Sequence, residues 1–475
     1  MSLEKDKNFL FKSTLYNFLG TSLKIASPML MFVLARIFGK EEFGIYISTQ
    51  LLIITLSRIA VFGLDTGLHW FLPQNNLNNR LLHLGFNEAL GRTFITSSGI
   101  FAILLVCAIF GLQKYFDSLE ILSSVELSIY AISTVPLALL HIFGGAAEGM
   151  RKPQYKIFVA DCATFAIAPL ISIALHFMDI QYALPIGFLI ANILGCFIYI
   201  LLIKKMLPFS INLLTSKIPR ELLIYSLPRG FSIIAVSILM RIDLWLILLL
   251  LGPGEAGVYA VMTTISNGLR TIRQSYTPIL LPVVAGMSKD RLDTDLKPVF
   301  SYCVNMVTLI QLAIGFFIVL FPDKILMIAG NDFIVQPETL GILLFGHLLG
   351  GFFLLSASVL NGIGKTMYTL KMDIISLCVA FVASYLLIPI FGLPGAALST
   401  LAYILLQSAW NNIYIFKLHL RLYSIKVIPY AIWSVLLLAL YILLPNFSFG
   451  LLDKIILYIA VLCGLGVTQF FILRK

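Results

Sequence analysis

The sequence predicts an all-α, polytopic membrane protein, and three observations support this fold class. Of its 475 residues, 59% are hydrophobic and only 12% are charged, and the mean hydropathy is +0.97. Soluble domains contain about one quarter charged residues. The apolar residues gather into runs of roughly 20, the length that a membrane-spanning helix needs. Finally, Lys and Arg concentrate in every second connection between these runs.

The apolar runs predict fourteen transmembrane helices. The first six lie near residues 13–36, 43–72, 89–112, 121–147, 157–178 and 183–204. Six more lie near 221–251, 256–284, 299–321, 338–362, 372–390 and 394–416, and two close the chain near 426–445 and 452–472. Nothing before Lys12 has the form of a cleavable signal peptide, because the first apolar run is too long for one.

The positive charges orient these helices. With the N-terminus in the cytoplasm, the inward segments contain 22 Lys and Arg residues, and the outward loops contain four: Lys40, Lys114, Lys324 and Lys454. Lys and Arg accumulate on the cytoplasmic side of membrane proteins. We therefore expect both termini in the cytoplasm. The net charge of +10 reflects this topology and does not indicate binding to nucleic acid.

An internal repeat divides the chain into two halves. Three short segments of the first half return in the same order at nearly the same offset, the first of them exactly 213 positions later. The pairs are GKEEFGIY at 39–46 with GPGEAGVY at 252–259, EGMRKPQY at 148–155 with NGIGKTMY at 361–368, and ALPIG at 183–187 with GLPGA at 392–396. The period spans six helices, an even number, so the halves share one orientation, as parallel repeats do.

This repeat sets the expected domain organisation. We predict an N-terminal six-helix lobe over residues 1–204, a cytoplasmic crossover linker over 205–220, a C-terminal six-helix lobe over 221–417, and helices 13 and 14 over 418–475. Two similar bundles of this kind enclose a cavity that opens to either side by rocking. No connection exceeds roughly 20 residues. The absence of an extramembrane catalytic domain favours transport over catalysis.

Five basic residues lie deep within the predicted helices: Lys24, Arg58, Arg241, Arg270 and Arg273. Each costs about 2.5–3.5 kcal/mol at a lipid-exposed helix centre, so we expect these side chains to face the bundle interior or water. Arg58 and Arg270 occupy matching depths in helices 2 and 8. The deep cations outnumber the deep acids, Asp65 and Asp243, by five to two. This surplus favours an anionic cargo bound by these five side chains.

A structural role for the same cations is the alternative. Arg58 and Asp65 share a helix face, but about 10 Å of axial rise separates them, so we do not expect a direct ion pair. Arg241 and Asp243 point in nearly opposite directions and cannot neutralise each other. His69 follows Asp65 by one turn. Asp65, His69 and Asp243 are candidates for coupling transport to Na⁺ or H⁺.

No cofactor and no catalytic cluster are expected. The six cysteines lie inside apolar runs without a metal-like spacing, which indicates neither a zinc site nor a disulfide framework. An integral-membrane polymerase or acyltransferase would show a large outer loop or a His/Asp/Arg cluster at an interface. Neither feature appears in the sequence, so we expect a protein that is not an enzyme.

The first predicted hairpin resembles that of polysaccharide flippases (Wzx-type). The likeness rests on LARIFGKEEFGIYISTQLLIITLSRIAVFGLDTGL at residues 34–68, and on the plan of fourteen helices in two lobes. The resemblance implies the fold of the multidrug/oligosaccharidyl-lipid/polysaccharide (MOP) exporter superfamily. It also implies that a polyprenyl-diphosphate-linked oligosaccharide crosses the bacterial cytoplasmic membrane from the inner to the outer leaflet, for polysaccharide or lipopolysaccharide synthesis.

The resemblance also bears on the site and the partners. The cationic central cavity of the family maps by helix and depth onto Arg58, Arg270, Arg241 and Lys24. Lipid-linked oligosaccharide, membrane lipids, and polysaccharide polymerase or assembly proteins are the implied partners. Trp70, Tyr259 and Tyr276 are candidates for stacking on sugar rings, or else belong to the core or the interfacial belt.

Three other functions are weighed against this one. A lipid II flippase shares the fourteen helices and the cationic cavity, and the sequence does not separate it from the first reading. An ion-coupled multidrug exporter on the same fold predicts an acid-lined cavity for cationic drugs, whereas this chain has a basic surplus. A purely structural scaffold does not explain five deep cations.

Overall fold

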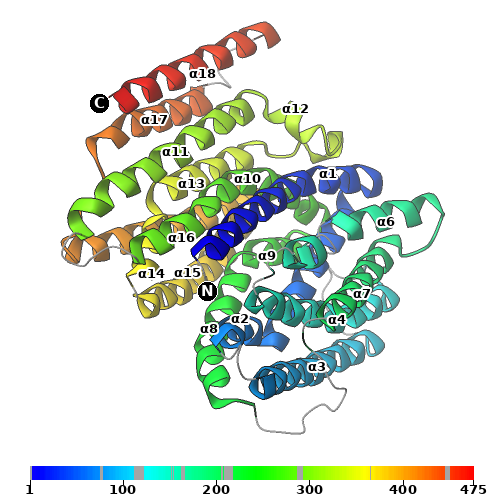
Figure 1. Ribbon diagram of the computed structural model, residues 1–475. Coiled ribbons are helices and arrows are strands. Elements are labelled where there is room, and N and C mark those ends of the chain that lie inside the picture. Colours follow the sequence, from blue (N-terminus) through cyan, green and yellow to red (C-terminus); the bar gives the residue numbers. More distant parts are fainter. Residues whose placement is uncertain are drawn as a thin grey trace. The chain divides into compact units, whose positions relative to one another are not determined.

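The computed structural model describes residues 3–74, 79–111, 122–150, 152, 155–161, 166–204, 207, 218–285, 292–363, 365–443 and 450–474. Side chains before Met29 lie outside the description. The described residues form helices joined by short connections and contain no β-strand (Figure 1). The predicted all-α fold class is confirmed.

The helices of the first half overlap the predicted segments. They are α1 (Leu3–Val61), α2 (Leu64–Gln74), α3 (Asn79–Ile109), α4 (Ser124–Gly149), the π-helix η3 (Lys156–Asp161), α6 (Ala168–Phe177), α7 (Ala183–Ile203) and α8 (Arg220–Leu239). Helices α1 and α3 each begin ten residues before the predicted start. The long α1 holds the first predicted helix and most of the second. Gly39, with a non-helical backbone (φ 77°), separates the two parts.

The second half also follows the predicted order. Its helices are α9 (Ile242–Leu250), α10 (Pro253–Ala285), α11 (Leu292–Leu320), α12 (Pro322–Leu326), η6 (Asn331–Phe333), α13 (Glu338–Phe353), α14 (Ser356–Gly362), α15 (Thr366–Phe391), α16 (Leu393–Lys417), η7 (Ile425–Val427), α17 (Ile428–Leu443) and α18 (Leu451–Arg474). The predicted helices at 43–72, 157–178, 221–251 and 338–362 are each divided into shorter pieces.

Many of these helices are suited to a bilayer. Within the described ranges, nine are long and apolar enough to cross a membrane, and two shorter apolar segments accompany them. The chain is therefore a multi-pass membrane protein. Helix α10 is not among the nine, although its 33 residues exceed the length of a span. It carries Arg270 and Arg273, and these charges lower its hydropathy.

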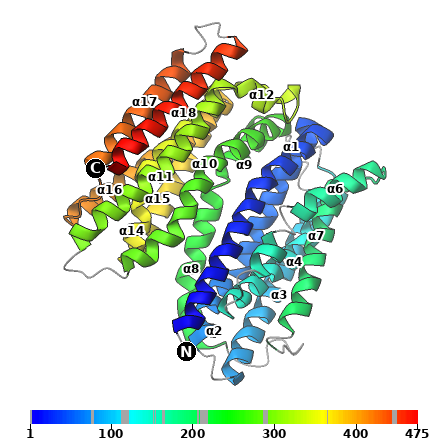
Figure 2. The same cartoon turned by 45° about the horizontal axis from the view of Figure 1, so that its top comes forward.

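Contacts group the chain into two units. Unit 1 comprises Met1–Arg241 and Leu248–Gly257, and unit 2 comprises Ile242–Ile247 and Val258–Lys475. In unit 1, α4 packs against α1, α2, α3 and α7, and α8 packs on α1 and α2 (Figure 1). In unit 2, α16 packs on α13 and α15, while α17 and α18 run beside α11 (Figure 2). Packing thus assigns α8 to unit 1. The predicted lobe boundaries follow the internal repeat and not the packing of the helices, so they stay a prediction.

The first pair of repeated turns meets within unit 1. Gly39 and Gly252 both have positive φ, 77° and 100°, and each directly precedes the helix that follows it. A Cβ atom on Gly44 would lie 1.9 Å from the carbonyl oxygen of Pro253, and one on Gly257 would lie 2.0 Å from that of Lys40. Because 253 − 40 and 257 − 44 are both 213, the two contacts are equivalent by the repeat. The same residues recur because the two helix starts pack on each other.

Candidate functional site

The second predicted helix breaks in the middle, next to two of the predicted site residues. Helix α1 ends at Val61, and Phe62 (φ 46°) and Gly63 (φ 77°) take left-handed conformations before α2 begins. Helix α8 packs directly on this break, because a Cβ atom on Gly63 would lie 2.5 Å from the carbonyl oxygen of Ser226. The Phe62 and Phe231 rings meet edge to face, 5.0 Å apart. The break is therefore held by tertiary packing.

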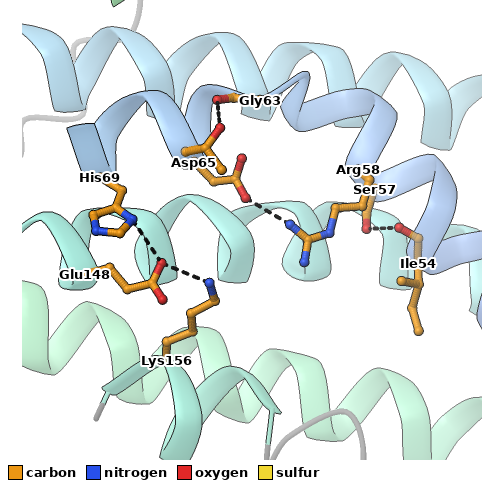
Figure 3. A network of polar contacts seen from close by, with 9 residues as sticks. Ile54, Ser57, Arg58, Gly63, Asp65, His69, Glu148 and Lys156 are labelled. Carbon is orange, nitrogen blue, oxygen red and sulfur yellow. Dashed lines mark hydrogen bonds and ion pairs between the residues drawn. The ribbon is translucent and has the colours of Figure 1, made fainter. Parts of the chain in front are cut away.

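An ion pair spans this break. Arg58, in the last turn of α1 before it, donates from Nη1 to Oδ2 of Asp65 at 2.9 Å (Figure 3). The expectation that these residues do not pair is wrong. It assumed a continuous helix between them, whereas the turn at 62–63 interrupts the axial rise and the long arginine side chain covers the remaining distance. The Asp65 side chain is 8% exposed and the Arg58 side chain 27%.

His69 belongs to a separate polar group. Its Nδ1 lies 3.7 Å from Oε2 of Glu148, which also accepts from Nζ of Lys156 at 2.9 Å (Figure 3). The three side chains come from α2, α4 and η3. His69 thus pairs with Glu148, while Asp65 pairs with Arg58. The Glu148–Lys156 pair was not predicted, because its residues lie on different helices, α4 and η3, and no helical spacing joins them.

Arg241 lies next to the helix that carries Arg58. Its Nη1 donates to Oγ1 of Thr55 at 3.2 Å and to the carbonyl oxygen of Ser237 at 3.3 Å. Thr55 is buried and stands three residues before Arg58, on the same side of α1. Unit 1 therefore places two of the predicted cations, Arg58 and Arg241, at one stretch of α1.

The acid that follows Arg241 by two positions belongs to unit 2 and is bonded there. Asp243 Oδ2 accepts from the Tyr259 hydroxyl at 2.7 Å and from Oγ1 of Thr400 at 3.2 Å. Its Oδ1 accepts from the backbone N–H of Leu244 at 2.8 Å. The donors come from α9, α10 and α16, so Asp243 ties three helices together. Tyr259 is fully buried, so its role is this hydrogen bond and not stacking on a sugar.

Arg270 and Arg273 lie three residues apart on α10, as predicted. With the Gln274 amide turned so that its oxygen faces the guanidinium, this oxygen accepts from Nε and Nη2 of Arg270, both at 3.1 Å. Among the residues that the structure describes, no carboxylate lies within 4.0 Å of either arginine. His347, which is buried, and Tyr403 are within electrostatic range of both guanidinium groups, and the Asp243 carboxylate is within electrostatic range of Arg270. Arg270 and Arg273 are thus two neighbouring cations that form no ion pair with any residue the structure describes.

Lys24 and Trp70 are two further residues that the sequence singled out. Lys24 lies among the side chains outside the description, so its role stays a prediction. Trp70 stacks on Tyr225, with ring centroids 4.6 Å apart and an interplanar angle of 6°. Within the described part of the chain, no cluster of three His, Cys, Asp or Glu residues is arranged to hold a metal ion.

Several hydrogen-bond partners of the predicted site residues were not predicted from the sequence. The contact between Arg270 and Gln274 has the helical spacing of four, so a search for such pairs would have found it. Thr400 is 157 positions from Asp243, and Thr55 is 186 positions from Arg241. No local pattern connects residues at these separations.

Comparison with known proteins places this arrangement in a family. A family model described as "Polysaccharide biosynthesis protein" matches residues 33–334. No curated protein matches the chain in sequence.

Solved structures share the fold. The chain is similar to "Lipid II flippase MurJ, inward closed conformation", with a TM-score of 0.74 and 14% identity, over 97% of this chain and 99% of that one. It is also similar to an inward-facing multidrug resistance MATE family transporter of the MOP superfamily (TM-score 0.63, 16% identity, 84% of this chain and 95% of that one). A third similar structure is a MOP superfamily transporter from Pyrococcus furiosus (TM-score 0.52, 14% identity, 84% and 96%). At these identities the likeness shows that the chain shares the fold of these proteins.

Proposed function

Because the chain belongs to the polysaccharide biosynthesis protein family, we propose that it translocates a polyprenyl-diphosphate-linked oligosaccharide across the bacterial inner membrane by alternating access. The oligosaccharide is a repeat unit of O-antigen, capsule or exopolysaccharide. The MOP transporter fold supports a transport role and not an enzymatic one. The excess of Lys and Arg in the connections predicted to face inward supports cytoplasmic termini.

One observation carries the proposal: Arg270 and Arg273 are adjacent cations in a helix of membrane-spanning length, and neither has a carboxylate partner among the described residues. A guanidinium group inside a membrane protein costs several kcal/mol unless it is paired or hydrated, about 2.5–3.5 kcal/mol on insertion scales. Guanidinium groups bind phosphate through paired N–H donors. A diphosphate supplies the negative charge that these two residues lack.

The other parts of the substrate place further demands on the protein. The hydroxyl groups of a glycan cannot cross hydrocarbon without hydrogen-bond partners, so a hydrated path must shelter them. The polyprenyl chain is apolar and stays in the lipid. In this proposal Arg58, Arg241 and Lys24 also bind the diphosphate, and Asp65, His69 and Asp243 are candidates for coupling to Na⁺ or H⁺.

A lipid II flippase is the second candidate. The observation that favours it is the similarity to a solved lipid II flippase over 97% of this chain. Lipid II also contains a polyprenyl diphosphate, so the same arginines would serve. An exporter of cationic drugs is less well supported, because in the described residues Asp65 and Asp243 already accept hydrogen bonds from protein donors.

A deletion strain tests the proposal. Loss of the gene should remove surface polysaccharide and cause polyprenyl-linked oligosaccharide to accumulate on the inner side. Complementation with the wild type or with Arg36→Ala, an exposed arginine of α1 three residues before the break at Gly39, should restore the polysaccharide. Complementation with a chain carrying both Arg270→Ala and Arg273→Ala should not.

The outcomes separate the candidates. Normal surface polysaccharide without the gene contradicts the proposed cargo. A defect confined to peptidoglycan synthesis, with lipid II accumulating, supports the second candidate instead. Full complementation by the double variant contradicts the role of Arg270 and Arg273 while leaving the cargo assignment intact.

A further inference from the structure

The deep arginines of the two units differ in one respect. Arg58 in unit 1 is paired with Asp65, whereas Arg270 and Arg273 in unit 2 have no carboxylate within 4.0 Å among the described residues. We propose that Asp65 is a charge-selectivity residue: as the resident counter-ion of Arg58, it prevents singly charged lipid phosphates from binding there and yields only to a diphosphate. This inference rests on the proposed function, because it concerns which anion reaches Arg58.

Asp65 is held in place by its surroundings. Its main chain lies against α4 so closely that a Cβ atom on Gly145 would lie 2.2 Å from the Asp65 carbonyl oxygen. The break that precedes it is held by α8, and the Thr66 hydroxyl donates to the carbonyl oxygen of Gly63 at 2.8 Å. The carboxylate itself is 8% exposed. Asp65 therefore cannot follow Arg58 if that side chain moves.

Arg58 has the freedom that Asp65 lacks. It lies in the last turn of α1, and 27% of its side chain is exposed. An arginine side chain is long and rotates about several single bonds. A ligand on the exposed side of the guanidinium can therefore draw Arg58 away from Asp65 without unfolding a helix.

The pair sets a threshold for the charge of the ligand. Leaving the buried Asp65 carboxylate without Arg58 is strongly unfavourable. A ligand must therefore attract Arg58 more strongly than one exposed negative charge does. A diphosphate has two phosphoryl groups. It can accept from Arg58 and also from Arg241, which is bonded to Thr55 one turn away on α1. A phosphodiester with a single charge cannot engage both guanidinium groups equally well.

Such a threshold serves a protein that works within a bilayer. Phospholipids with one negative charge surround it at far higher concentration than any diphosphate-linked intermediate. An unpaired arginine open to the membrane would be occupied by these lipids. Specificity often requires an element that disfavours the wrong ligand, and Asp65 supplies it at Arg58.

Binding measurements on the full-length chain test this inference. The protein is placed in nanodiscs of neutral phosphatidylcholine, with or without added phosphatidylglycerol, and the Kd for farnesyl diphosphate is measured. In the wild type, competition by phosphatidylglycerol at Arg270 and Arg273, which have no carboxylate partner among the described residues, sets the baseline change in this Kd. In Asp65→Asn, which removes the charge and keeps the shape, phosphatidylglycerol should weaken binding by about tenfold more than in the wild type, the effect of losing one charge-assisted contact. Equal sensitivity of the wild type and Asp65→Asn would overturn the inference.

Two further variants show whether the effect acts through Arg58. Combining Arg58→Gln with Asp65→Asn should return the phosphatidylglycerol sensitivity to the wild-type level, and sensitivity that persists in the double variant contradicts the inference. If Asp65→Asn does not fold, Asp65→Ser removes the same charge in a smaller side chain and gives the same comparison.

The failure of this inference can be told apart from the failure of the proposed function. If Arg270→Gln weakens farnesyl diphosphate binding and Arg58→Gln does not, selectivity at Arg58 is excluded while the proposed function stands. If neither substitution weakens binding, the arginines do not bind diphosphate, and both proposals lose their site.

Discussion

At the scale of residues, the deep acids and the deep arginines of unit 2 differ, within the described part of the chain, in their partners from the protein. Asp65 accepts from Arg58, and Asp243 accepts from Tyr259 and Thr400, so protein donors satisfy both carboxylates. No carboxylate of the described ranges lies within ion-pair distance of Arg270 or Arg273. The sequence indicated more deep basic residues than deep acids. In unit 2 this surplus lies in two neighbouring guanidinium groups, those of Arg270 and Arg273.

The hydrogen bond from Tyr259 to Asp243 should contribute measurably to stability. Tyr259→Phe removes the donor and leaves a carboxylate oxygen with one partner fewer, at a cost of about 1–3 kcal/mol in the free energy of unfolding. Tyr46→Phe is the matched control, because Tyr46 is equally buried at the equivalent position of the repeat and its hydroxyl lies near the neutral Gln50 side chain and not near a carboxylate. Thermal unfolding in detergent compares the two. An equal loss in both variants would show that the Asp243 contact does not stabilise the fold.

Some residue-level features could be predicted from the sequence and others could not. The shared face of Arg270 and Arg273 follows from their spacing on a helix, and the structure places both on α10. The Arg58–Asp65 pair was excluded because the prediction measured axial rise along an unbroken helix. Phe62 and Gly63 take left-handed conformations, so the axial rise of an unbroken helix does not apply between Arg58 and Asp65. No proline in the sequence signals this break.

At the scale of elements, two of the breaks in the predicted helices stand next to charged residues. One break, at Phe62–Gly63, separates Arg58 from Asp65, and another, at Met240–Arg241, lies just before α9, of which Asp243 is the second residue. Hydropathy patterns predicted continuous helices at 43–72 and 221–251 because apolar residues flank both breaks. The interruptions depend on packing against other helices, as for α8 at Gly63, which a local pattern does not contain.

The repeated turn makes a prediction about the start of α10. Gly257→Ala should destabilise the protein by about 1–3 kcal/mol, because the new methyl group would meet the Lys40 carbonyl oxygen at 2.0 Å and the backbone must shift. Gly268→Ala, on the same helix with nothing within 4 Å, should be neutral or stabilise by up to about 1 kcal/mol. Thermal unfolding of the two variants in detergent checks this difference. Equal effects would mean that the helix starts do not touch at Gly257.

At the scale of the whole molecule, composition and the spacing of apolar runs were sufficient to predict a helical, multi-pass membrane protein. Each of the fourteen predicted segments has a helical counterpart among the described residues. The hairpin at residues 34–68 indicated the family that the family model matches over residues 33–334. The polar contacts of Arg241 and Asp243 could not be predicted, because each joins residues more than 150 positions apart.

Transport in a reconstituted system tests the central claim most directly. Purified protein is inserted into liposomes that carry a fluorescent polyprenyl-diphosphate-linked sugar, and its movement between leaflets is followed by the loss of fluorescence to a membrane-impermeant quencher. The wild type and Arg36→Ala should accelerate this movement, while the variant with both Arg270→Gln and Arg273→Gln should fall to the rate of protein-free liposomes. A wild-type rate no faster than that of empty liposomes, or a double variant as fast as the wild type, would contradict translocation through these arginines.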